Sequence, residues 1–365
     1  EWLNDSEAAG MTDASRVEDP LFGPLLGPGA LVASPEQAPV VKPRVLADAE
    51  AVRKVADRWE STPRSDLPEV GDGDGTLEHA LSGVKVLDLS RVIAGPCAAR
   101  VLAEFGADVL SLQSESRLDW ALSFHLIFNA GKRSATLDFT DDAGKEKLFK
   151  LMDSYAPDAM IHNYRHLDLA RTIGVGPEAM RERYPDIAYT HLNAYGNHGI
   201  WQERPGFEQV VQAVSGMQAA YAVKGRPRLL PSPIIDIGCG LLGAFGTMLG
   251  LYNQRRTGQG IMTATHLTSV SVLLQLLPVS AFQRDACLAR ARENGRDLKL
   301  DKNREVVASI FLTLSGFTCL AGPRGDIRRW LVEAGLYDEA EAYSAADPLE
   351  LAAKKLRWHT IRHWR

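Results

Sequence analysis

The chain has few cysteines and no zinc-binding pattern. Its 365 residues include Cys97, Cys239, Cys287 and Cys319, which lie far apart and form no CxxC pair. None of them has a histidine nearby at zinc-ligand spacing. We therefore expect no metal site, and the sparse cysteines favour a reducing, cytoplasmic location.

Long hydrophobic runs are absent as well. The longest, residues 270–282, is interrupted by two serines, a glutamine and a proline. It falls short of the ~18 uninterrupted apolar residues of a membrane span. The chain starts with Glu1-Trp2-Leu3 and has no basic segment followed by an apolar one. We expect neither a transmembrane helix nor a signal peptide.

There is no excess of positive charge. Lysine and arginine total 41 against 46 for aspartate and glutamate, giving a formal charge of -5, which argues against a general nucleic-acid binder. Hydrophobic residues make up 45% and charged residues 24%, as in soluble globular proteins, so disorder of the whole chain is excluded. At about 100–200 residues per domain, the chain has room for two or three domains.

Nucleotide-binding fingerprints are missing too. The first predicted strand, residues 84–89, leads into the turn SRVIAGP at 90–96, where a dinucleotide-binding domain has GxGxxG. No GxxxxGK[ST] loop occurs anywhere in the chain. The sequence therefore gives no support to NAD or P-loop nucleotide chemistry.

Three regions follow one another along the chain. Residues 1–82 are rich in Pro, Gly, Asp, Glu and Ala, which predicts an N-terminal extension and linker with one helix over 47–60. Residues 83–283 alternate between β-favouring runs and helix-like stretches, which is typical of a large α/β, Rossmann-like domain with a parallel sheet. Residues 284–365 predict a smaller α+β domain. In the large domain we expect strands at 84–89, 108–112, 158–161, 187–192 and 261–265, and helices at 98–105, 142–155 and 177–183.

Asp236 lies at a junction between two predicted elements. Residues 233–235 predict a strand, and residues 238–256 predict a helix with four glycines near one face, which indicates close packing against another backbone. A carboxylate near a helix start is favoured in its ionised form by roughly 0.3–1 kcal/mol. It suits either a nucleophile or a helix cap, and both remain open. Cys239 is a rival nucleophile, but it has no histidine nearby in the sequence to activate it.

Eight short motifs occur in order between about residues 83 and 280. They are GVKVLDLSRVIAGP at 83–96, LAEFGADV at 102–109, NAGKRS at 129–134, HNYR at 162–165, RPGFE at 204–208, QAVSG at 212–216, PIID at 233–236 and RTGQG at 256–260. Together they resemble the class III CoA-transferases, the group containing formyl-CoA and carnitine-CoA transferases and the α-methylacyl-CoA racemases.

The resemblance implies a catalytic apparatus around Asp236. This residue would attack an acyl-CoA thioester, giving an acyl-aspartyl anhydride and then an aspartyl-CoA thioester. Backbone amides around Gly238 to Gly240 are the expected oxyanion donors. Glu208 is expected as a further acid or base, or as a solvated carboxylate on an exposed helix turn. The racemases have a histidine where this chain has Phe207, and phenylalanine carries no proton, so a transferase is favoured.

The resemblance also implies a site for coenzyme A. Arg91, Val92 and Ala94 follow the first strand, at the edge where open parallel sheets bind ligands. A segment after the second strand that usually supplies an arginine to a CoA phosphate is replaced by 113–116, so that contact is missing or comes from Arg117. The other expected contacts are Lys132, Arg133, Asn163, Tyr164 and Arg171. The alternative for the lysine and the two arginines is that they are solvated surface residues without a ligand.

The expected partners are an acyl-CoA, a carboxylic acid and a second copy of the chain in an interlocked homodimer. No permanently bound cofactor, nucleic acid or membrane is expected. One alternative function is an acyl-CoA racemase or epimerase. The other is a non-catalytic CoA-binding half of a tandem protein.

Residues 1–41 resemble the closing segment of a family domain, and the C-terminal region is shorter than is usual in the family. We hypothesise a tandem origin, with 42–82 as the joining linker and an apolar segment containing Leu21, Phe22, Leu25 and Leu26 packed on the large domain. A disordered tail is the alternative, given the Pro, Gly and Asp content.

Overall fold

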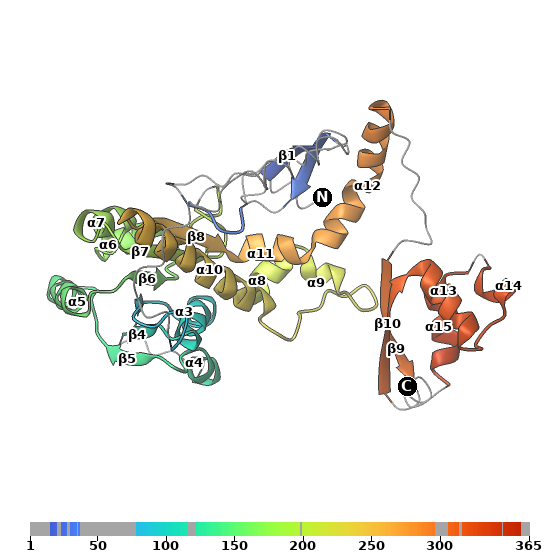
Figure 1. The fold of residues 1–365 in the computed structure, drawn as a ribbon, viewed down its shortest axis with the longest axis horizontal. Helices are drawn as coiled ribbons and strands as arrows, with labels where there is room; N and C mark the ends of the chain where they lie inside the picture. Colours follow the sequence, from blue (N-terminus) through green and yellow to red (C-terminus); the bar gives the residue numbers. More distant parts are fainter. Residues whose placement is uncertain are drawn as a thin grey trace. The chain divides into compact units, whose positions relative to one another are not determined.

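The structure of the protein is a computed structural model. The chain forms two compact units, Glu1–Arg290 and Ala291–Arg365 (Figure 1). Helix α12 (Leu276–Glu293) runs across this division and across the predicted one at 283/284. The structure describes residues 15–19, 23–27, 30–34, 36, 78–114, 122–197, 199–295, 306–313, 316–344 and 346–358. The helix predicted over 47–60 lies outside these residues, as do the side chains of the apolar segment at 21–26.

A six-stranded parallel sheet organises the large unit, with the strand order β5-β4-β3-β6-β7-β8 (Figure 1). The predicted Rossmann-like α/β class is confirmed. The fold prediction missed β5, whose four side chains are all exposed, so that it carries no hydrophobic signal. The strands are β3 (Lys85–Asp88), β4 (Asp108–Gln113), β5 (Arg133–Thr136), β6 (Ala159–His162), β7 (Ala188–Asn193) and β8 (Met262–His266).

Successive residues of the strands enter two apolar cores on opposite faces of the sheet. Val86 packs in a core with helices α3 (Ala94–Glu104) and α10 (Ile234–Thr257). Leu87 packs in the other core with α5 (Asp142–Tyr155), α6 (Leu167–Thr172) and α7 (Pro177–Arg183). Both side chains are fully buried. Side chains alternate along a strand, so adjacent apolar residues need helices on both faces.

Helix α10 packs closely against α3, β7 and β8. A Cβ added at Gly243 would lie 2.7 Å from Leu192 Cδ2, and one at Gly240 would lie 2.8 Å from the Ala94 carbonyl oxygen. The predicted close packing of the glycines is therefore confirmed. The predicted strand over 233–235 is wrong, because α10 begins at Ile234. The apolar, β-branched pair at its start belongs to the first helical turn and buries Ile235 completely.

Among the described residues, α10 is also the one helix long and apolar enough to cross a membrane by length and composition. Half of its most apolar window is buried inside the protein. A core helix of a soluble protein passes the same test, so this feature is weak evidence for a span. The remaining helices of the large unit are α4 (Leu122–Phe128), α8 (Glu208–Val214), α9 (Met217–Ala220) and α11 (Leu267–Leu274).

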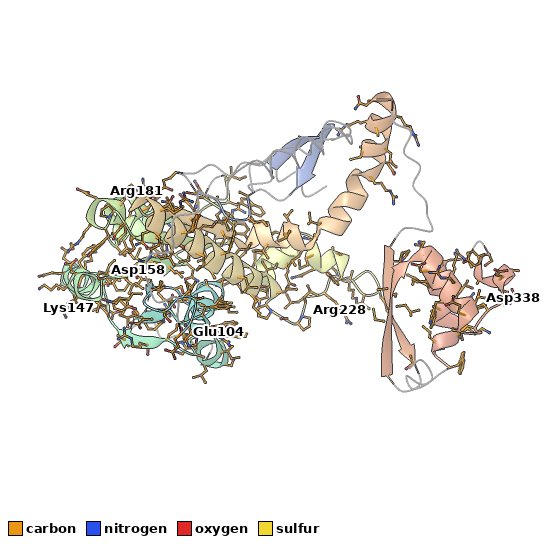
Figure 2. The ribbon with its side chains drawn as sticks, viewed as in Figure 1. Glu104, Lys147, Asp158, Arg181, Arg228 and Asp338 are labelled. Carbon is orange, nitrogen blue, oxygen red and sulfur yellow. The ribbon has the colours of Figure 1, made fainter. Side chains whose placement is uncertain are left out.

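The outer edge of β8 is paired with a segment from near the N-terminus. Ala33 and Ala264 exchange two backbone hydrogen bonds of 2.9 and 2.8 Å in an antiparallel bridge. Glu36 accepts a hydrogen bond of 3.3 Å from the Met262 N–H and forms an ion pair with Arg181 of α7, labelled in Figure 2. Part of the extension is thus docked on the sheet. The hairpin of β1 (Ser15–Asp19) and β2 (Gly23–Gly27) precedes it.

The small unit combines a two-stranded antiparallel sheet with helices. Its core contains Ile327, Leu331, Leu351 and Leu356. The sheet and helices match the α+β character that the sequence indicated. The elements are β9 (Val306–Thr313), β10 (Gly316–Pro323), α13 (Arg324–Glu333), α14 (Glu339–Ala342) and α15 (Pro348–Leu356).

Candidate active site

A cavity of about 370 Å³ lies where β3, β6 and β7 end in the large unit. This is the carboxyl edge of the parallel sheet, where the chain leaves neighbouring strands towards helices and a ligand fits between them. The lining combines apolar side chains with polar and charged groups, which small-molecule sites use to bind and orient a ligand. The lining residues are Arg91, Val92, Ile93, Ala94, Asn163, Tyr164, Arg165, Leu169, Leu192, Asn193, Ala194, Arg204, Pro205, Gly206, Phe207, Asp236 and Leu267.

Asp236 lies in the first turn of α10, is only 9% exposed, and lines this cavity. Burial, and next the nearby negative charge of Glu208, raise the pKa of Asp236 from 3.8 to about 7. The expectation that the helix start favours the ionised form is therefore wrong in its net direction. Removal from water outweighs the helix dipole, which contributes at most about 2 kcal/mol even in partly buried geometries.

Glu208 lies at the start of α8 and holds the start of α10. One carboxylate oxygen, Oε2, accepts a 2.7 Å hydrogen bond from the backbone N–H of Asp236. The other, Oε1, accepts one of 2.6 Å from Gln212 Nε2, and Gln212 Oε1 in turn accepts from the Leu230 N–H at 2.9 Å. Glu208 is 3% exposed, so the expected exposed helix turn is wrong. Its oxygens are occupied by hydrogen bonds that fix the position of Asp236.

Gly238 and Gly240 do not supply free amides. Both lie inside α10, beyond the first turn, where each backbone N–H is bonded to the carbonyl four residues earlier. The hydrogen bond of 2.9 Å from the Ile237 N–H to the Pro233 carbonyl shows that this pattern has begun before Gly238. The predicted oxyanion role of these glycines is therefore not supported.

Of the residues expected to bind coenzyme A, five line the cavity. Arg91, Val92 and Ala94 come from the β3–α3 turn, and Asn163 and Tyr164 come directly after β6. Because β3 and β6 are neighbours in the sheet, these two segments meet at one edge. Their contacts with coenzyme A stay predictions.

Lys132 has a different place from the one expected. Its Nζ donates to Asp88 Oδ2 at 2.8 Å, to the Pro96 carbonyl at 2.9 Å and to Asn129 Oδ1 at 3.0 Å. Both charged side chains of the Lys132–Asp88 pair are completely buried. All three ammonium hydrogens have partners, so Lys132 stabilises the end of β3. It does not line the cavity.

Arg133 and Arg171 also lie away from the cavity lining. Arg133 Nε donates to Asp108 Oδ1 at 2.9 Å, and both side chains are exposed. Arg171 Nε donates to Glu178 Oε2 at 3.1 Å, and its guanidinium also pairs with Asp168. The structure does not support the expectation that these arginines contact coenzyme A, because both guanidinium groups form ion pairs with carboxylates of the same chain. Arg117 lies outside the described residues.

Two arginines that sequence reasoning did not assign to the site line the cavity, namely Arg165 and Arg204. Arg165 directly follows the Asn-Tyr pair of its motif, and Arg204 begins the motif that contains Phe207, so their positions in these motifs were the available signal. The Arg204 guanidinium stacks over the Trp201 ring at 4.8 Å. Together with Arg91 they give the cavity a positive lining.

Phe207 is 58% exposed, lines the cavity and stands immediately before α8. It brings an apolar ring, and no proton donor, to the side of the cavity near Asp236. Cys239 is fully buried, and its burial raises the pKa of the thiol. A protonated, enclosed thiol is a poor nucleophile, so the rival role of Cys239 is not supported. No cluster of three potential metal ligands occurs in the part of the chain that the structure describes.

Comparison with known proteins identifies the family. The model of CoA-transferase family III matches residues 81–329. This chain belongs to CoA-transferase family III.

Two similar proteins are also named as CoA-transferases. A probable fatty acyl-CoA transferase of Mycobacterium tuberculosis is 29% identical over 208 residues, which cover 53% of this chain and 52% of that protein. A CoA-transferase/lyase of a Marinomonas species is 25% identical over 348 residues, which cover 90% of this chain and 40% of that protein. The chain thus spans about half the length, or less, of these relatives.

A solved structure shares the fold. The crystal structure of a hypothetical protein from Mycobacterium tuberculosis superposes with a TM-score of 0.62 at 23% identity, over 78% of this chain and 79% of that chain.

Proposed function

We propose that the protein transfers coenzyme A from an acyl-CoA to a carboxylic acid, with Asp236 as the nucleophile. The observation that carries the proposal is that Asp236 is the one carboxylate among the described residues lining the cavity of a family III chain. Its pKa of about 7 leaves a large ionised fraction at neutral pH, and the ionised form is the one that attacks.

The reaction proceeds through three covalent states of Asp236, namely an anhydride with the donor acid, a thioester with coenzyme A and an anhydride with the acceptor acid. A carboxylate oxygen attacks the thioester carbonyl, the C–S bond breaks, and coenzyme A leaves as a thiolate. The thiolate then attacks the aspartyl carbonyl of the anhydride and releases the original acid as a carboxylate. The acceptor carboxylate attacks the resulting aspartyl-CoA thioester, and the freed thiolate takes the new acyl group from the anhydride. Asp236 is regenerated, and no proton or redox equivalent is consumed.

The lining of the cavity fits such a substrate. The guanidinium groups of Arg91, Arg165 and Arg204 match the phosphates of coenzyme A, because arginine binds phosphate oxygens in a bidentate manner. Leu169, Leu192 and Leu267 contribute the apolar surface that a pantetheine arm requires. Phe207 offers no second base on the opposite side of an α-carbon, which disfavours the racemase alternative.

The proposal includes a homodimer. Helix α10 carries an exposed apolar stripe of Leu241, Phe245, Leu249 and Tyr252, spaced at three to four residues along one face. A second copy of the chain is the occupant we propose for it, since a stripe of this kind exposed to water favours association. The four cysteines are free, which fits the proposed cytoplasmic location.

A transfer assay tests the proposal. Purified protein is incubated with an acyl-CoA and a panel of carboxylic acids, and new CoA thioesters are identified by mass spectrometry. The proposal expects a new thioester with the wild type and none with Asp236→Asn. Binding of acyl-CoA without any turnover in the wild type would favour the non-catalytic alternative. Exchange of the α-hydrogen for deuterium without an acceptor acid would favour the racemase.

A further inference from the structure

We propose that Asn163 is a positioning residue that fixes the conformation of the Arg91–Ala94 turn at the cavity, and that it does not itself bind the substrate. The inference rests on the proposed function for the ligand, coenzyme A. The structural part stands on this chain's own hydrogen bonds.

The side-chain amide of Asn163 is bonded to both sides of one backbone residue. Asn163 Oδ1 accepts a hydrogen bond of 2.9 Å from the Arg91 N–H, and Asn163 Nδ2 donates one of 2.7 Å to the Arg91 carbonyl. The two residues are 72 positions apart in the chain and follow neighbouring strands, β6 and β3. The amide therefore holds the β3–α3 turn just as it leaves the sheet.

The turn needs such support at the next residue. Val92 has a φ of 71°, in the left-handed region that β-branched residues rarely adopt. A strained conformation of this kind persists only where its surroundings over-determine it. The carbonyl bonded by Asn163 belongs to the peptide plane between Arg91 and Val92, so its orientation helps to set the φ of Val92.

The rest of the turn is packed too tightly to rearrange independently. A Cβ added at Gly95 would lie 2.3 Å from Ser90 Cβ and 3.3 Å from Asn163 Cγ. The Ser90 N–H in turn donates to Asp88 Oδ1 at 2.9 Å, and Asp88 is paired with the buried Lys132. One end of the turn is thus anchored by Asp88 and its middle by Asn163.

The consequence concerns the cavity. Arg91, Val92 and Ala94 all line it, so a change of Val92 to negative φ displaces three lining residues together. Replacing Asn163 by alanine removes two backbone hydrogen bonds without removing any lining backbone. On the order of a 10- to 100-fold increase in the Kd for coenzyme A is expected.

Hydrogen exchange of the ligand-free protein is the first test. Asn163→Ala is expected to accelerate exchange in peptides covering residues 90–95. Asn163→Asp is expected to accelerate it too, because a carboxylate oxygen then faces the Arg91 carbonyl oxygen where Nδ2 donated. Asn253→Ala is the matched control, because Asn253 Nδ2 also donates to a backbone carbonyl, that of Gln259 at 2.8 Å, but does not line the cavity. Exchange at 90–95 that is unchanged in both Asn163 variants would overturn the proposal.

A double-mutant cycle with Val92→Gly is the second test, read as the Kd for coenzyme A by calorimetry. Glycine adopts positive φ readily, so Asn163→Ala is expected to weaken binding less in the Val92→Gly background than in the wild type. An equal loss in both backgrounds would show that Asn163 acts as a direct ligand and would overturn the proposal. If the wild type binds no coenzyme A, the proposed function fails, while the exchange experiment still tests the role of Asn163.

Discussion

Asp236→Asn is expected to stabilise the protein at neutral and alkaline pH while abolishing transfer. The pKa of Asp236 is about 7 in the folded protein against an ordinary value of 3.8. At about 1.4 kcal/mol for each pH unit, this difference corresponds to about 4 kcal/mol. Asparagine has nearly the same shape, carries no charge and keeps the backbone N–H that donates to Glu208 Oε2.

The sign of the effect follows from proton binding. Between pH 3.8 and about 7 the folded state holds a proton on Asp236 that the unfolded state has lost, so wild-type stability falls as the pH rises through this window. Above about pH 7 the full penalty is present, and below pH 3.8 it is absent. The gain from Asp236→Asn therefore grows across this window to at most about 4 kcal/mol.

Urea unfolding of the wild type and Asp236→Asn between pH 4 and pH 8 measures this directly. The variant is expected to match the wild type near pH 4 and to exceed it by roughly 2–4 kcal/mol at pH 8, with an unchanged urea m-value. A variant that is less stable than the wild type at pH 8, or a gain that does not depend on pH, would refute the reasoning. Either result would mean that the Asp236 carboxyl is not buried beside Glu208 as described.

Three further predictions concern other parts of the large unit. Lys132→Met leaves Asp88 buried without its cation and is expected to cost about 3–5 kcal/mol in urea unfolding, whereas Arg133→Met, at an exposed pair, is expected to leave the free energy of unfolding nearly unchanged. Deleting residues 1–40 removes the segment paired with Ala264 and exposes the edge of β8, so a lower melting temperature and more aggregate in sedimentation are expected; an unchanged melting temperature would make the docked segment dispensable. The kcat/KM for transfer is expected to rise about tenfold per pH unit below about pH 7 and to level off above it, as Asp236 ionises; a flat profile from pH 5 to pH 8 would argue against this carboxylate as the nucleophile.

Much of the fold was predictable because the strands of a sheet covered on both faces are short apolar runs. β6 and β7 are buried at every residue, and both were found within one residue of their bounds. β5 was missed because it is an exposed edge strand without that pattern. The start of α10 was predicted as a strand because its β-branched residues favour strands in isolation, while packing of the glycine face against α3 and β7 favours the helix.

The site was predictable only in part. The β3–α3 turn was found because its position after a strand is a local property of the sequence. Asp236 was found through its motif, although the strand predicted before it is the first turn of α10. The burial of Glu208 depends on Asp236, 28 residues away, and the role of Lys132 depends on Asp88, 44 residues away. Pairings of this kind are set by the tertiary structure. The sequence of a motif does not distinguish a charged residue that binds a ligand from one that pairs with a buried residue of the same chain.

The most direct test of the account is to identify the residue that carries the acyl or CoA group during turnover. The protein is mixed with an acyl-CoA, trapped with hydroxylamine, digested and examined by peptide mass spectrometry, with Asp236→Asn as the control. The account predicts a hydroxamate at Asp236 that depends on acyl-CoA and is absent from the variant. Modification at Cys239 or Glu208 instead, or continued transfer by a folded Asp236→Asn variant, would contradict it.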